Sequence, residues 1–375
     1  MNNQTLSVCM IVRNESKMLP RCLKSVAWAD QIIVVDTGST DDTLKIARDH
    51  GAMVFTLPWP HDFAAARNES LKHATSDWIL VLDADEWLAH GADWQIRRLI
   101  GVNHANGYTC LIRNYMSDFD RSQASEHYHV RLFRNKPHYR FHGAIHESIV
   151  SHDPNDPFEP VNFPGLLILH DGYRPEVFKN KDKHARNKSL LMQSVEREPE
   201  NAYCWYNLCQ SQWDEGDLAS AQASILRCLS LLPDENSIIA DSAWIKHLYL
   251  TQAIDGPAEA SQSLQQAPEA CQMNPDYWNC RAGLAMALKD LSEALRCFEI
   301  AASMNKPDFF HVGSYDQGNL TWKPYLGMAQ VSILRGYPES AAVYLDKAMD
   351  LSPGNPVLTA QKTSLTERLP WLAFV

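Results

Sequence analysis

The sequence lacks three features that would place it in other classes of protein. None of its nine cysteines forms a CxxC pair or part of an evenly spaced framework. No stretch approaches the roughly 20 apolar residues that a transmembrane helix needs. With 34 Lys and Arg against 45 Asp and Glu, the chain has no basic block. We therefore expect reduced cysteines, no transmembrane segment and no binding to a nucleic-acid backbone.

The first residues, MNNQTLSVCMIVRNES, also lack a signal-peptide pattern. They contain no basic n-region, and the charged Arg13 and Glu15 come too early for an apolar h-region. We therefore expect a cytoplasmic location. At 375 residues, with 45% hydrophobic and 21% charged residues, the chain is long enough for two domains, each with its own core.

The first ~180 residues alternate short apolar runs with amphipathic segments. The apolar runs predict strands that are covered on both faces, and the segments between them predict helices. The predicted strands cover residues 6–12, 31–36, 52–57 and 78–83, and the predicted helices cover residues 16–29, 39–51 and 62–75. This order predicts an α/β domain over residues 1–180, with a mostly parallel sheet and helices on both faces.

From about residue 185 the sequence becomes helical in character and rich in Ala, Leu, Gln and Trp. A 34-residue tetratricopeptide template, with its large and small positions, fits from residues 202, 241, 275 and 322. This predicts an all-α, TPR-like helical solenoid over residues 181–375, with a generic helical bundle as the alternative. The segment 306–322 breaks the period and is either a functional loop or a longer connection.

Polar residues follow the predicted strands in "RNES", "DTGSTDD" and "DADE". Because ligands of parallel α/β sheets bind beyond the carboxyl ends of the strands, these residues are expected at one rim. In a strand, residues two positions apart point the same way, so Asp83 and Asp85 would share one face at the point where the sheet ends. Their hard oxygen ligands suit Mg²⁺ or Mn²⁺. The alternative is a strand end whose acidic residues only face water.

Three segments carry a resemblance to a known family. "SVCMIVRNESKMLPRCLKSV", "IIVVDTGSTDDT" and "WILVLDADEW" resemble, in order and spacing, the nucleotide-sugar domain of family-2 glycosyltransferases, which have the GT-A fold. The resemblance covers about residues 5–175. The repeat half resembles the tail of a branch that includes sublancin-type peptide S-glycosyltransferases. The resemblance implies a metal-dependent, inverting transfer from a UDP-sugar to a peptide, protein or saccharide acceptor.

The resemblance also implies roles for residues at the rim. It places Asp85 on the metal ion and Asp83 near the ribose or a metal-bound water, and it makes His170 a possible further metal ligand. Asp36 would bind the uracil or ribose, and the loop from Val12 to Glu15 would contact the base. The residues expected to bind the nucleotide sugar are Val12, Asn14, Glu15, Asp36, Gly38, Ser39, Arg67, Asp83, Ala84 and Asp85.

Local chemistry adds further expectations for some of these residues. Gly38 allows the chain to turn, and Ser39 or Thr40 is expected to cap the next helix. Arg67 is suited to bind a phosphate group in a bidentate manner, although a surface arginine on an amphipathic helix is the alternative.

An acceptor hydroxyl needs a base on the side of the anomeric carbon opposite the leaving group. The segment "HVRLFRNKPHYRFHGAIHES" resembles the acceptor-side stretch of the family, which ends in His-Glu. This implies that Glu147, beside His146, is the catalytic base. A salt-bridged glutamate is the alternative.

Three other functions compete with this interpretation. A sugar nucleotidyltransferase shares the sheet order, but the loop "RNESKMLPRC" lacks the glycines of a triphosphate-binding loop. A haloacid-dehalogenase phosphatase also has a strand-end DxD, but Trp87 stands where Thr or Val is expected. The third alternative is a non-catalytic repeat scaffold with a decayed transferase domain. The repeats themselves are expected to hold a polypeptide acceptor or to form a homodimer.

Overall fold

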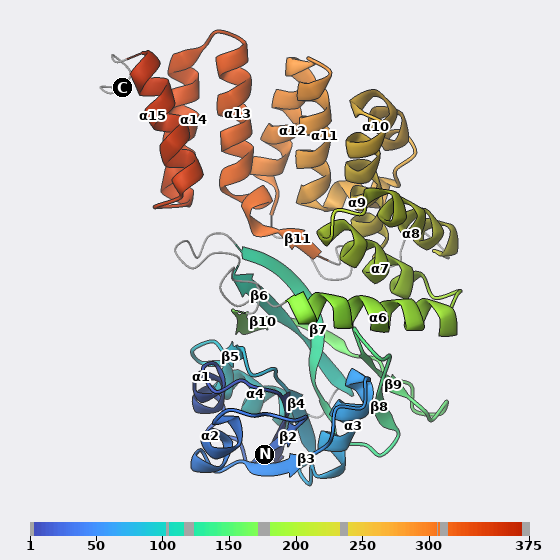
Figure 1. The fold of residues 1–375 in the computed structure, drawn as a ribbon. Helices are drawn as coiled ribbons and strands as arrows, with labels where there is room; N and C mark the ends of the chain where they lie inside the picture. The colour runs from blue at the N-terminus through green and yellow to red at the C-terminus, as the bar shows by residue number, and fades with distance from the viewer. Residues whose placement is uncertain are drawn as a thin grey trace. The chain divides into compact units, whose positions relative to one another are not determined.

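The structure is a computed structural model that describes residues 4–102, 105–115, 124–171, 181–232, 239–305, 307 and 314–369 (Figure 1). The chain divides into two compact units. The first comprises Met1–Asn114 and His127–Arg197, and the second comprises Tyr115–Glu126 and Glu198–Val375. The first unit therefore includes α6 (Lys181–Arg197), which the sequence placed with the repeats.

The first unit is the predicted α/β fold. Its elements before α6 are, in chain order, β1 (Leu6–Val12), α1 (Leu19–Ser25), β2 (Gln31–Asp36), α2 (Thr43–Asp49), β3 (Met53–Thr56), α3 (Phe63–Lys72), β4 (Trp78–Val81), β5 (Glu86–Leu88), α4 (Ala92–Gly101), β6 (Gly107–Tyr115), β7 (Ala124–Arg134), β8 (Tyr139–His142), β9 (Ser148–Ser151) and β10 (Val161–His170). The first two strands begin and end where the sequence predicts them, because their apolar runs are bounded by polar residues.

The main sheet has the strand order β3-β2-β1-β4-β7-β6-β10-β5, and β8 and β9 form a separate antiparallel pair. The first four strands are parallel, as predicted. The other half is mixed, since β7 runs antiparallel to β4 and β5 runs antiparallel to β10. The carboxyl ends of β1, β2 and β4 therefore lie along one edge, where the candidate site is found.

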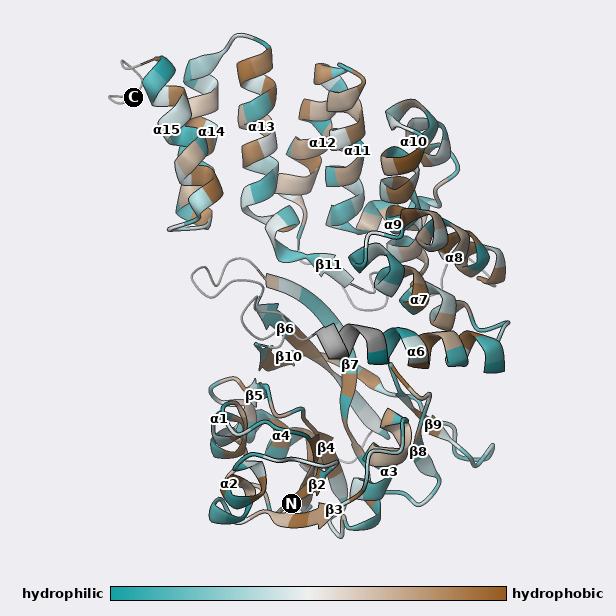
Figure 2. Cartoon of the chain, viewed as in Figure 1, coloured by the Kyte–Doolittle hydropathy of each residue, from teal (hydrophilic) through white to brown (hydrophobic). Residues whose placement is uncertain are grey.

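Both faces of the parallel half are covered, as the continuous apolar runs predict. In β1, Val8 and Met10 belong to a buried cluster with side chains of α1, α2 and α4. Cys9, between them, belongs to a second cluster with side chains of α3 and of the β8–β9 pair. Figure 2 shows β2 and β4 as largely hydrophobic (brown). Packing on both faces anchors the strand in the domain, and with it the polar residues that follow its end.

The second unit consists of successive helix pairs. Its elements are α7 (Ala202–Asp214), α8 (Leu218–Leu231), α9 (Ala240–Ile254), α10 (Pro257–Leu264), η1 (Glu269–Met273), α11 (Pro275–Ala287), α12 (Leu291–Ser303), β11 (Ser314–Asp316), η2 (Gln317–Leu320), α13 (Trp322–Leu334), α14 (Pro338–Leu351) and α15 (Pro356–Arg368). The first helix of each of the four pairs begins within one residue of a predicted repeat start. This confirms the TPR-like region.

Small residues explain how the paired helices approach each other closely. Ala221, Ala260, Ala294 and Ala341 occupy the predicted small position of the second helix in each pair, and all four are fully buried. A larger side chain at such a position would have to displace the facing helix.

All nine cysteines lie in the described part of the chain, and none of them forms a disulfide. Eight are buried, where a free cysteine acts as a small apolar residue of the core. Among the described residues, no helix is both long and apolar enough to span a membrane.

Candidate active site

The acidic segment after β4 forms a turn rather than the end of a strand. The strand ends at Val81, two residues earlier than predicted, and the backbone N–H of Glu86 donates to the carbonyl of Asp83 (3.0 Å). A carboxylate oxygen of Glu86 accepts in return from the backbone N–H of Asp83 (2.9 Å). The prediction that Asp83 and Asp85 share one strand face was therefore wrong, because a turn does not alternate side chains as a strand does.

Two arginines bind Asp83. Arg67 Nη2 donates to Asp83 Oδ1 (2.8 Å), and Arg131 Nη2 lies 3.4 Å from Asp83 Oδ2. Arg131 also forms a 2.6 Å ion pair with Glu86, which is 2% exposed. Burial alone would raise the pKa of Asp83, but the charges of the two arginines outweigh it and hold the pKa below its usual value. The Asp83 side chain is still 34% exposed, so a ligand can reach it.

Arg67 also contacts Glu147, the predicted base. Its Nε donates to Glu147 Oε1. The two residues come from different elements, Arg67 from α3 and Glu147 from the loop before β9. The backbone N–H of Phe63, the first residue of α3, donates to the carbonyl of Ala144 in that loop (2.8 Å). The helix and the loop are thus joined beside the ion pair.

One donor atom of Arg67 has no partner. Its Nη1 is buried and forms no hydrogen bond with any residue that the structure describes. Arg67 is 6% exposed, so it is not the surface arginine that the sequence left as an alternative. A buried guanidinium N–H without a partner costs about 1–3 kcal/mol. A bound anion or hydroxyl would remove that cost.

Asp85 faces a different partner. Its Oδ2 lies 3.3 Å from Nε2 of His170, the last residue of β10. Burial lowers the pKa of His170, but its hydrogen bond to Asp85 and that carboxylate's charge outweigh the burial, so the net shift is upward. The structure thus brings together Asp85 and His170, two of the three residues that the sequence places at the metal, and directs the third, Asp83, toward the arginines instead.

A buried asparagine fixes the orientation of His170. Asn114 in β6 is 3% exposed, and its Oδ1 lies 2.7 Å from His170 Nδ1. Its Nδ2 lies 2.9 Å from Nδ1 of His127 in β7. An amide oxygen only accepts and an amide nitrogen only donates, so His170 carries a proton on Nδ1 and His127 accepts on Nδ1. Burial, with its neighbouring positive groups, lowers the pKa of His127 to about 3, which keeps it neutral.

The Asp85–His170 pair fits a divalent cation. In octahedral coordination at 2.0–2.1 Å, neighbouring ligands lie about 3 Å apart, close to the Oδ2–Nε2 distance. No three His, Cys, Asp or Glu side chains in the described part of the chain are grouped to hold a metal. Mg²⁺ is commonly held by one or two protein side chains together with substrate phosphates, so two ligands suffice for such a site.

The loops after β1 and β2 are joined by hydrogen bonds. Asn14, in a left-handed conformation with φ 56°, accepts from the backbone N–H of Thr40 (2.7 Å), and its own N–H donates to Ser39 Oγ (2.9 Å). The N–H of Glu15 donates to Thr43 Oγ1 (2.8 Å). The structure therefore brings the first two predicted rim loops together.

Within the second of these loops, Asp36 holds its own turn. It is 2% exposed, and its carboxylate accepts from the backbone N–H groups of Gly38 and Ser39 (both 3.0 Å). Gly38 has φ 113°, so glycine is required there as predicted. The predicted cap was wrong, because α2 begins at Thr43 with Asp42 as its N-cap and no side-chain capping bond.

The remaining expected residues, Val12 and Ala84, are 3% and 4% exposed. Sequence reasoning missed Arg131 and Asn114. Arg131 lies in the quoted acceptor-side segment but had no role assigned to it, and Asn114 lies outside the quoted segments. Each contacts the site because β7 and β6 belong to the same sheet as β4 and β10. The alternation of charged and apolar residues in "EHYHVRLFR" was the only sequence signal that could have indicated polar groups on one face of β7.

Comparisons with known proteins show what the chain is similar to. Residues 7–156 match the family model described as glycosyl transferase family 2. The chain is 34% identical over 270 residues to a TPR repeat-containing protein of Synechococcus elongatus. The aligned region covers 70% of this chain and 65% of that protein. It is 32% identical over 200 residues to the SPbeta prophage-derived glycosyltransferase SunS of Bacillus subtilis, which covers 52% of this chain and 46% of the relative.

The chain thus spans between about half and two thirds of the lengths of these two relatives. Among solved structures, the alignment with S. aureus TarS 1–349 covers 70% of this chain and 92% of the TarS chain. The identity is 14% and the TM-score is 0.38. That similarity is too low to establish a common fold.

Proposed function

We propose, from the premise that residues 7–156 form a family-2 glycosyltransferase domain, that this chain transfers a sugar from a UDP-sugar to an acceptor with inversion at the anomeric carbon. The observation that carries the proposal is the Asp85–His170 pair at the carboxyl edge of the sheet, next to a buried arginine with an unused donor atom. A cation site beside a free N–H donor suits an anionic diphosphate.

Asp85 and His170 would hold Mn²⁺ or Mg²⁺, which when bound supplies positive charge to the departing diphosphate. Arg67 Nη1 would donate to a diphosphate oxygen, and its ion pairs with Asp83 and Glu147 keep the guanidinium in place. Asp36 and the loop around Asn14 and Glu15 would hold the nucleoside. These residues bind and orient the donor rather than react with it.

Glu147 would take the proton of the acceptor. Because Arg67 binds Oε1, the proton would go to Oε2. The acceptor atom forms a bond to the anomeric carbon while the bond from that carbon to the diphosphate oxygen breaks, and UDP leaves. A thiol acceptor would need this base less than a hydroxyl would, because a thiol is already partly ionised near neutral pH.

The test is UDP release from a panel of UDP-sugars, measured with Mn²⁺, with Mg²⁺ and with a chelator. The expected result is metal-dependent release that falls at least 100-fold in Asp85→Asn, since the leaving group loses its main stabilisation. Asp93→Asn, an exposed aspartate in α4, is the matched control. If the wild-type chain releases no UDP and no UDP-sugar changes its melting temperature, the chain is a scaffold without transferase activity.

A further inference from the structure

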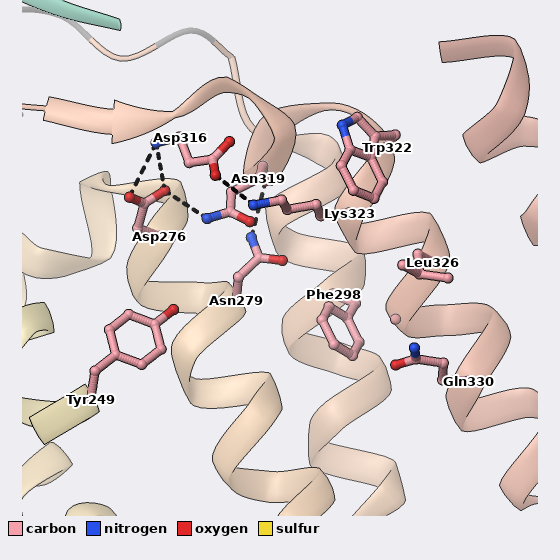
Figure 3. A pocket seen from close by; sticks show the side chains of 11 residues that line it. Tyr249, Asp276, Asn279, Phe298, Asp316, Asn319, Trp322, Lys323, Leu326 and Gln330 are labelled. Atoms are coloured by element: carbon pink, nitrogen blue, oxygen red, sulfur yellow. Dashed lines mark hydrogen bonds and ion pairs between the residues drawn. The ribbon is translucent and has the colours of Figure 1, made fainter. Parts of the chain in front are cut away.

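The charged side chains that line one cavity of the second unit are engaged with neighbouring residues. The cavity has a volume of about 470 Å³ and lies beside the end of the segment 306–322 (Figure 3). Asp276 Oδ1 accepts from the backbone N–H of Asp316 (3.0 Å) and from Asn319 Nδ2 (2.9 Å). Lys323 is ion-paired with Asp316. These contacts hold the end of the segment against α11 and leave no charged group of this wall to a ligand.

Two histidines of β7 in the first unit differ, because each has a ring nitrogen that no described residue engages. Burial alternates at the start of this strand, where Glu126 and Tyr128 are buried and His127 and His129 are partly exposed. The two histidines therefore share one face of the strand. Each ring forms one hydrogen bond, at Nδ1, with the described part of the chain. Nε2 of both rings is thus left for a ligand.

The bonds at Nδ1 determine what each Nε2 can do. His127 accepts at Nδ1 from Asn114, whereas His129 Nδ1 donates to the carbonyl of Val130 (3.0 Å). Burial, aided by neighbouring positive groups, lowers the pKa of His127 to about 3 and that of His129 to about 4, so both rings are neutral at pH 7. A neutral imidazole carries one proton, so Nε2 is a donor in His127 and an acceptor in His129.

Contacts at one end of this histidine pair lead to the candidate metal ligands. Asn114 joins His127 to His170 through its two amide atoms, at 2.9 Å and 2.7 Å. His170 in turn lies beside Asp85. His127 is therefore on the side of the site where the diphosphate would leave.

Contacts at the other end lead to the candidate base. Arg131, two residues beyond His129, lies 3.4 Å from Asp83. Arg67 binds both Asp83 and Glu147. The charge of Glu147 also acts on the His129 imidazole. The pair thus lies between the leaving group and the base, which is where an inverting transfer needs the anomeric carbon and its sugar.

We propose that His127 and His129 determine which sugar this chain transfers, by binding its hydroxyl groups. Nε2 of His127 donates to one hydroxyl oxygen, and Nε2 of His129 accepts from another hydroxyl group. A hydroxyl can play either part, whereas a neutral ring forms no ion pair with a carboxylate or an ammonium group. Arg131 nearby is already paired with Asp83 and Glu86. The sugar is therefore an uncharged one. This inference rests on the proposed function, because it names the sugar class of the same donor.

The test measures by calorimetry how tightly the full-length chain binds UDP and UDP-sugars in the presence of Mn²⁺. The probes are UDP, UDP-glucose, UDP-galactose, UDP-N-acetylglucosamine and UDP-glucuronate. At least one uncharged UDP-sugar should bind more tightly than UDP-glucuronate. His129→Phe should weaken the binding of that sugar about tenfold and leave the binding of UDP unchanged, because phenylalanine keeps a ring but has no acceptor.

Two further variants separate the acceptor atom of His129 from the packing of its ring. His129→Gln should restore part of the affinity for the UDP-sugar, since its amide oxygen can again accept from a hydroxyl. His90→Phe, the same change at an exposed position, is the matched control and should alter neither affinity.

Ring ¹⁵N spectra of the unaltered chain test the same contacts without a substitution. The Nε2 signals of His127 and His129 should shift with the UDP-sugar and not with UDP. The inference is overturned if the sugar moves neither signal, if His129→Phe weakens UDP as much as the UDP-sugar, or if UDP-glucuronate binds most tightly. A chain that binds neither UDP nor any UDP-sugar would overturn the proposed function as well, so the two failures are distinguishable.

Discussion

At the scale of single residues, the site depends on how each acidic group is paired. Asp83 and Asp85 are two positions apart, but one faces Arg67 and Arg131 and the other faces His170. The three carboxylates within residues 83–86 thus have different partners. Arginines pair with Asp83 and Glu86, whereas Asp85 lies beside a histidine that can itself be a metal ligand.

Asn114 is expected to position His170 as a metal ligand. Asn114→Leu should lower Mn²⁺ affinity in the presence of UDP about 10–100-fold, as loss of a hydrogen bond behind a ligating histidine commonly does. Calorimetry measures that affinity, and ¹⁵N spectra of His170 report whether the proton leaves Nδ1.

The matched control for Asn114→Leu is Thr109→Val. Thr109 Oγ1 donates to Asn162 Oδ1 (2.7 Å), so this change also removes a hydrogen bond between β6 and β10. It should reduce stability without changing the tautomer of His170. Equal loss of Mn²⁺ affinity in both variants would show that Asn114 only stabilises the sheet.

Glu147→Gln distinguishes a base from a group that only holds Arg67. If Glu147 takes the acceptor proton, kcat falls about 10²–10⁴-fold while the KM for the donor is unchanged. If it only orients Arg67, the donor KM rises and kcat changes less. We expect the first result for a hydroxyl acceptor and a smaller loss of kcat for a thiol acceptor. Steady-state kinetics with the identified acceptor gives the answer.

At the scale of elements, the sequence predicts what is local. The parallel strands and the four repeat starts follow from apolar patterns that lie within one segment. The contacts of Arg131 with Asp83 and Glu86 span 48 and 45 residues, and β7 pairs with β4 over 52–56 residues. A local pattern contains neither. The Asp85–His170 contact was predictable only through resemblance to a family.

Asp276, near the start of α11, is expected to make the second unit less stable as pH rises. Its pKa is raised from 3.8 to about 7, so the folded chain binds more protons than the unfolded chain between these values. The free energy of unfolding therefore falls as pH rises through that window, by at most about 1.4 kcal/mol per pH unit. The measurement is the melting temperature between pH 5 and pH 8.

Asp276→Asn should reduce this pH dependence, because its amide oxygen still accepts from Asp316 and Asn319 but does not titrate. Asp255→Asn, at an exposed position after α9, is the control and should keep the wild-type slope. An unchanged slope in Asp276→Asn would assign the dependence to another group.

At the scale of the whole molecule, the chain has two compact units with separate buried clusters. Separate cores predict two calorimetric unfolding transitions. UDP with Mn²⁺ binds the first unit in our account, so it should raise one melting temperature by mass action and leave the other unchanged. A single transition, or equal shifts of both, would show that the units unfold together.

The central claim is that Asp85 and His170 hold a divalent cation together with the nucleotide diphosphate. Electron paramagnetic resonance of Mn²⁺, titrated with the full-length chain with and without UDP, tests it most directly. We predict tight binding of one Mn²⁺ only when UDP is present, lost in Asp85→Asn and retained in Asp93→Asn. Binding that survives Asp85→Asn, or that does not depend on UDP, would contradict the account.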